Sequence, residues 1–218
     1  ILLNLILGYA VWTYNSKSRL NRILTFLIVC ILLIDISHLL SLETYGMKYS
    51  GAPVTLGSLG ISFFFPLLYT LSLYYPVKKN FRPRLLVALY GATTALAVCV
   101  ILSFKLFSPP PAGGGAGAAE IPGVFVVFYV LLTCFSLWLL FLATRNFFQS
   151  LKKGIIPYEA KTIRLLVAVG LPLGYVLSVV VWIDFFFEIP FPLVSLLLAI
   201  FTAFTVVLIF RFHVLDLK

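Results

Sequence analysis

The chain has 218 residues, of which 62% are apolar and 11% charged, and its formal net charge is +9. An ordinary soluble domain is about half apolar and about a quarter charged. So few polar residues cannot coat a soluble fold of this length, whereas a lipid bilayer accepts apolar side chains on the outside of a protein. The composition therefore excludes a soluble domain and predicts an integral membrane protein.

Seven apolar runs follow one another along the chain. They cover residues 1–14, 23–42, 54–75, 85–106, 124–148, 163–187 and 191–212. All but the first are near the length of about 20 residues that a spanning helix needs. They are too long and too uniformly apolar for the strands of a membrane barrel, which alternate over roughly ten residues. Because backbone groups in lipid must be satisfied internally, the sequence predicts an all-α bundle of seven transmembrane helices, forming one domain over residues 1–218.

The first run is shorter than the others. Fourteen helical residues reach about 21 Å, less than the roughly 30 Å of a hydrocarbon core. The run has neither the basic start nor the small-residue cleavage site of a signal peptide. We expect it to be the inner end of a helix that begins upstream of Ile1, so that the chain is a fragment.

The basic residues indicate which side of the bundle faces the cytoplasm. Fourteen of the 16 basic residues lie on one side of the predicted bundle, which carries the loops near residues 15–22, 76–84 and 145–164 and the C-terminal tail. The other side holds only Lys48 and Lys105. Positively charged loops remain cytoplasmic, so the predicted topology is N-terminus out and C-terminus in. The net charge then matches anionic lipid of an inner (plasma) membrane, and no nucleic-acid partner is needed to explain it.

One predicted outer connection is long. Residues 108–123 are rich in Pro, Gly and Ala and contain a single charged residue, Glu120. Such a segment cannot bury enough apolar surface to form a domain of its own. We therefore expect any stimulus to be met by the helices or by their immediate edges.

Helix-breaking residues lie within two of the predicted spans. Pro66 falls in the third run, and Gly170, Pro172 and Gly174 fall in the sixth. Neighbouring helices can satisfy the backbone groups that such residues free. Gly170 and Gly174 also form a small-xxx-small pair that suits close helix packing. These four residues are candidates for a hinge; the alternative is packing with a static kink.

Two ionisable residues lie within the second predicted span. Asp35 and His38 are three positions apart, so they project from one face of a helix. Counted from Arg22 at the inner edge, they lie about 20 and 24 Å along the helix axis, in the outer half of the bilayer. Ionisable groups at such depths are costly and commonly functional.

The sixth span offers residues that would complement this pair. Asp184, beside Trp182, and Glu188 reach a similar depth from their own helix. If the second and sixth helices touch, these residues form a carboxylate–imidazole pocket that opens outward and takes an unidentified small ligand or a proton, because a histidine beside a carboxylate titrates near neutral pH.

Two alternatives to the ligand or proton pocket stay open. Asp35 and His38 could satisfy each other or backbone groups as a buried polar pair, or they could contribute to a metal site, for which one histidine is thin support. The chain shows no Ser-His-Asp or Cys-His arrangement and no phosphate-binding glycine loop. We therefore predict no enzymatic activity for this region, no catalytic residue, no cofactor and no resident metal.

The C-terminal exit from the membrane carries a family resemblance. The chain ends IFRFHVLDLK, and upstream it contains IPYEAKTIRLL, IPFPLVSLL and FPLLYTLSLYYPVKKNFRPRLL. These stretches resemble the seven-helix sensor regions at the N-termini of bacterial histidine kinases and some diguanylate cyclases. Four residues match the exit pattern of that family, with Leu217 in place of its isoleucine: Arg211, Phe212, Leu215 and Asp216.

The resemblance implies a membrane sensor of the two-component type. A stimulus would shift the sixth and seventh helices, and the seventh would pass the movement to a cytoplasmic output domain covalently attached after Lys218. The full-length protein would then be a histidine kinase or a diguanylate cyclase, and a homodimer stays open. The alternatives are a small proton-coupled transporter or permease component and a structural membrane subunit.

Overall fold

The computed structural model describes residues 1–14, 16–43, 51–75, 83–107 and 123–152, together with residues 164, 166–170, 172, 174–176, 179, 200 and 204. All regular elements in these stretches are helical. They are α1 (Leu2–Tyr14), α2 (Arg19–Glu43), α3 (Gly51–Tyr74), α4 (Pro83–Phe107), α5 (Gly123–Leu151) and the short π-helix η1 (Leu166–Gly170).

The first five predicted helices are all present, and four of them, α2 to α5, are long and apolar enough to cross a membrane. Each of these four begins before the apolar run that predicted it. α2, for example, starts at Arg19 instead of residue 23, because arginine and leucine are good helix formers even where a continuous apolar run stops. Most of the sixth and seventh runs lie outside the described residues, so the number seven stays a prediction.

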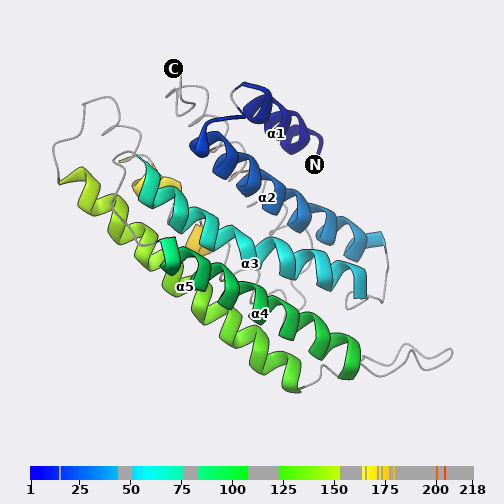
Figure 1. Cartoon of the computed structure of the whole chain (residues 1–218). Coiled ribbons are helices and arrows are strands. Elements are labelled where there is room, and N and C mark those ends of the chain that lie inside the picture. The colour runs from blue at the N-terminus through cyan, green and yellow to red at the C-terminus, as the bar shows by residue number, and fades with distance from the viewer. Residues whose placement is uncertain are drawn as a thin grey trace.

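The long helices lie side by side as a bundle (Figure 1), and α3 occupies its centre. α3 packs against α2, α4 and α5, whereas α1 packs on α2 and α4 packs on α5. Apolar side chains of α1 to α5 form one large core cluster, which includes Ile28 of α2 and Phe147 of α5. Tyr175 and Phe204, from the sixth and seventh predicted spans, pack against the same cluster.

α2 and α3 approach each other closely at two glycines of α3. A Cβ atom added at Gly60 would lie 2.7 Å from the carbonyl oxygen of Cys30 and 2.7 Å from Cγ1 of Ile34. One added at Gly57 would lie 2.8 Å from Oγ of Ser37. No larger residue fits at Gly60 without a shift of the α2 backbone. Small residues let membrane helices approach in this way, and the sequence prediction did not assign this role to Gly57 or Gly60.

α3 continues without a break through Pro66, the first of the predicted hinge residues. A proline cannot donate a backbone hydrogen bond to the carbonyl four residues earlier, here that of Ser62. Hydroxyl groups on both sides hydrogen-bond to the α3 backbone: Ser62 Oγ donates to the carbonyl of Ser58, and Thr70 Oγ1 donates to the carbonyl of Pro66 at 2.7 Å. Bending at Pro66 stays a prediction.

The other hinge candidates lie at the end of a departure from α-helical geometry and just after it. η1 ends at Gly170, which is buried; Pro172 is exposed, and Gly174 is buried within a helical stretch. The wider turns of a π-helix often occur at functional sites. Because η1 ends two residues before Pro172, its wider turn also leaves room for the proline ring beside the preceding turn of the helix. Movement at these residues stays a prediction too.

Candidate functional site

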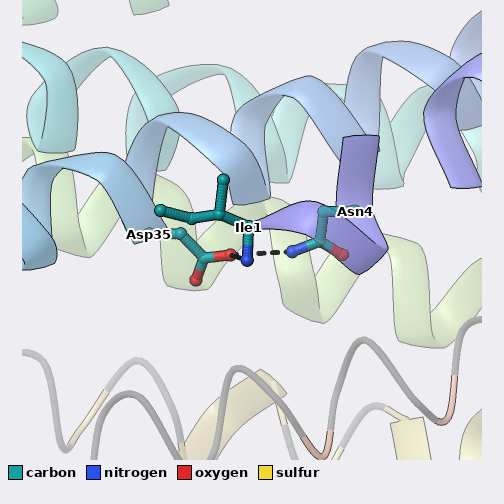
Figure 2. A network of polar contacts seen from close by, with 3 residues as sticks. All are labelled: Ile1, Asn4 and Asp35. Carbon is teal, nitrogen blue, oxygen red and sulfur yellow. Dashed lines mark hydrogen bonds and ion pairs between the residues drawn. The ribbon is translucent and has the colours of Figure 1, made fainter. Parts of the chain in front are cut away.

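The carboxylate of Asp35 lies where α2 packs on α1. Its Oδ2 accepts a hydrogen bond of 2.7 Å from Nδ2 of Asn4, and the backbone nitrogen of Ile1 lies 3.6 Å from the same oxygen (Figure 2). The Asp35 side chain is 17% exposed. Asn4 is the polar residue of an otherwise apolar run, ILLNLILG, and the antiparallel packing of α1 on α2 brings it to Asp35.

Asn4 itself is 3% exposed, and only one half of its amide is bonded. Nδ2 donates to Asp35, while Oδ1 is buried and has no hydrogen-bond partner among the described residues. An unsatisfied buried acceptor costs about 1–3 kcal/mol. The site thus combines a carboxylate inside an apolar bundle with an amide that is half satisfied.

A second interhelical hydrogen bond lies two residues from Asp35 along α2. Ser37 Oγ donates to the carbonyl oxygen of Pro53 on α3 at 2.7 Å, next to the close approach at Gly57. The same end of α2 is therefore tied to α1 through Asp35 and to α3 through Ser37. A displacement of this end of α2 would act on both neighbours at once.

The other sequence-predicted site residues are not brought to Asp35 by the part of the chain that the structure describes. His38 belongs to α2, but its side chain lies outside the described residues. So do three residues proposed for the same pocket and four proposed for the membrane exit: Trp182, Asp184, Glu188, Arg211, Phe212, Leu215 and Asp216. A pocket shared by the second and sixth helices stays a prediction. Within the described ranges, no group of three or more His, Cys, Asp or Glu residues could hold a metal ion.

Two more polar links join α3 to its other neighbours, and sequence reasoning missed both. The hydroxyl groups of Thr70 and Tyr90 lie 3.0 Å apart and connect α3 to α4. Nδ2 of Asn146 on α5 donates to Oγ of Ser72 on α3 at 3.1 Å. Asparagine within an apolar run is the feature that could have pointed to Asn4 and Asn146, whereas serine, threonine and tyrosine are too common in membrane helices to single out.

In the part of the chain that the structure describes, these contacts define an all-helical bundle, with four helices long and apolar enough to cross a membrane and a carboxylate–amide pair between its first two helices. Comparison of the chain with protein families, with curated proteins and with solved structures finds no match.

Proposed function

We propose that the chain is a seven-helix signal-input domain of a bacterial two-component-type receptor, with its N-terminus outside and its C-terminus in the cytoplasm. The observation that carries the proposal is the carboxylate of Asp35, held against Asn4 inside an apolar bundle. An ionisable group in a membrane span is costly and is kept where it serves a function. The FRFHVLDLK exit supplies the resemblance to sensors and the direction of output.

The hydrogen bonds suggest a route for the response. A change at Asp35 alters the contact of α2 with α1, and the bond from Ser37 to Pro53 passes a displacement of α2 to α3. α3 packs on α5 and shares a core with Tyr175 and Phe204, which belong to the predicted sixth and seventh spans. The seventh span would carry the movement to an output domain through the exit that begins at Arg211.

The second candidate is a small proton-coupled transporter, and the same carboxylate favours it, because intramembrane Asp residues also serve in proton relays. The two functions differ in what lies downstream of Lys218 and in what crosses the membrane. A sensor requires a cytoplasmic output domain in the same reading frame and moves no solute. A transporter requires no cytoplasmic output domain, but it moves protons across the membrane when it is reconstituted in liposomes.

The proposed orientation can be tested by labelling single cysteines in intact cells. In a background without Cys30, Cys99 and Cys134, the Ala112→Cys variant places a thiol in the predicted outer loop, and the Ser16→Cys variant places one in the exposed α1–α2 turn. A membrane-impermeant maleimide should label the first variant in intact cells and the second only after permeabilisation. The opposite pattern would overturn the orientation, and equal labelling at both sites would overturn the spans between them.

The function is tested by the reading frame past Lys218 and by the output of the full-length protein in membrane vesicles. Asp35→Asn keeps the shape of the side chain and removes its charge, and Thr94→Val, on the exposed face of α4, is the matched control. We expect Asp35→Asn to change the response of kinase or cyclase output severalfold and Thr94→Val to leave it unchanged. Proton uptake by liposomes that disappears in Asp35→Asn, without an output domain, would replace the sensor by the transporter.

A further inference from the structure

The unsatisfied oxygen of Asn4 points to a second state of its contact with Asp35. Figure 2 shows the Asn4 amide directed at Asp35 through its nitrogen, with Oδ1 turned away. This orientation suits a charged carboxylate, which only accepts hydrogen bonds. It leaves Oδ1 of a 97% buried residue without a donor. No other described group supplies that donor.

A proton on Asp35 would supply it. A protonated carboxyl has one O–H donor and keeps an acceptor oxygen, so it complements an amide, which has one acceptor oxygen and an N–H donor. After a rotation of the amide about its last side-chain torsion, which is broad in asparagine, the Asp35 hydroxyl donates to Asn4 Oδ1 while Asn4 Nδ2 donates to the other Asp35 oxygen. Both halves of the amide are then bonded.

We infer that Asn4 and Asp35 together form a proton-binding site, in which the Asn4 amide changes its hydrogen bonding as Asp35 takes up or releases a proton. The step is a simple binding equilibrium: the carboxylate and one proton give the neutral acid, and no other bond is made or broken. This inference deepens the proposed function, because it names the proton as the stimulus that the bundle receives at Asp35.

A metal cation fits the site less well than a proton. Sodium and other hard cations take several oxygen ligands, as the six to eight of calcium illustrate. The described side chains at the site offer only the Asp35 carboxylate and, after rotation, Oδ1 of Asn4. A proton needs one donor oxygen and one acceptor, which is what the pair provides.

Among the described residues, the elements packed around Asp35 bring few titratable groups to it. Just before α1, the backbone nitrogen of Ile1 lies 3.6 Å from Oδ2 of Asp35, and residues 1–8 of this region contain no titratable side chain. α3 has no titratable side chain in residues 51–60, the stretch that packs opposite this part of α2. On α2 itself, His38 lies one turn further along and Glu43 ends the helix.

The inference is tested by solid-state NMR on the full-length protein in lipid bilayers, with labelled Asp and Asn side chains, over a pH titration. The carboxyl carbon of Asp35 reports its proton, and the amide carbon and nitrogen of Asn4 report the change in hydrogen bonding. We expect all three resonances to shift with one common midpoint. The amide of Asn146, bonded to Ser72 on α3, is the control in the same spectra and should not follow that midpoint.

Two further arms separate the alternatives. In the Asp35→Asn variant the Asn4 resonances should become independent of pH; if the variant does not fold, the common midpoint in the parent protein still decides the question. Replacing sodium by choline at constant pH should leave the resonances unchanged, and a saturable response to sodium would overturn the proton site in favour of a metal cation.

Different results would contradict the proton site and the proposed sensor function. Asn4 resonances that do not respond while Asp35 is protonated would overturn the proton site, whatever the output of the protein does. A common midpoint without any effect of pH on output would leave the proton site standing and contradict its role as the stimulus of a sensor.

Discussion

α3 and α4 have nearly the same length and both are apolar enough to cross a membrane, yet α3 is largely buried in the bundle and α4 is largely exposed. In α3, 67% of the most apolar stretch is buried inside the protein, whereas in α4 the corresponding share is 22%. α3 touches three other long helices, and α4 touches two. Of the four spanning candidates, the most buried one is also the least apolar.

The difference follows from what surrounds each helix. α3 carries buried hydroxyl residues whose hydrogen bonds go to its own backbone or to a neighbouring helix, among them Ser62, Thr70 and Ser72. The outward face of α4 presents apolar side chains such as Leu85, Val87 and Val98. Lipid offers no partner for a polar group and is as apolar as leucine. In this bundle the central helix α3 is accordingly richer in glycine, serine and threonine than the peripheral helix α4.

The largest difference in stability between α3 and α4 variants is expected when one leucine in each helix is replaced by alanine. Leu71 of α3 is 7% exposed, and Leu85 of α4 is 53% exposed. Leu71→Ala leaves a cavity among packed neighbours and should lower the free energy of unfolding by about 2–3 kcal/mol, mainly through lost packing. Leu85→Ala removes atoms that face lipid and should change it by less than about 0.5 kcal/mol.

Both variants can be measured by heating the purified protein with a thiol-reactive dye. In a Cys99→Ser, Cys134→Ser background the dye reports unfolding through Cys30, which is 5% exposed in the folded bundle. Equal losses of stability for Leu71→Ala and Leu85→Ala would contradict the central position of α3, or would indicate that another protein surface covers α4.

A smaller effect is expected from adding one methyl group to a glycine of each helix. At Gly60 the new Cβ would lie 2.7 Å from the backbone oxygen of Cys30, whereas at Gly91 of α4 it would meet nothing within 4 Å. Gly60→Ala should therefore cost about 1–2 kcal/mol through overpacking. Gly91→Ala should be neutral or slightly stabilising, because alanine is the better helix former. A stable Gly60→Ala variant would mean that α2 and α3 can separate without loss.

The smallest effect concerns the hydrogen bond that joins the two helices. A double-mutant cycle of Thr70→Val and Tyr90→Phe isolates the contact between their hydroxyl groups, which are 3.0 Å apart. Such interhelical bonds average about 0.6 kcal/mol in membranes, and we expect a coupling energy of that size. Thr94→Val, whose hydroxyl bonds only to its own helix at the Tyr90 carbonyl, should show no coupling with Thr70→Val.

The helices could be predicted from the sequence because an uninterrupted apolar run has few other solutions in a membrane. The prediction placed the start of α3 at residue 54 and that of α4 at residue 85, within a few residues of the structure. It also placed Asp35 and His38 on α2, and it could identify Asp35 as unusual because carboxylates are rare in such runs. The partner of Asp35 could not be found in this way, since it depends on which helices touch.

The sequence by itself determined that the described part of the chain is helical, where its first five helices run and that the second span carries two ionisable residues, Asp35 and His38, because these properties depend on composition and on local spacing. Only the tertiary structure decided that Asn4 meets Asp35, that Gly60 sits against the backbone of α2 and that α3 stands at the centre. In a bilayer the apolar faces of two helices resemble each other and also resemble the lipid that surrounds them. Pairing is then decided by small residues and a few hydrogen bonds, whose complementarity exists only once the helices lie side by side.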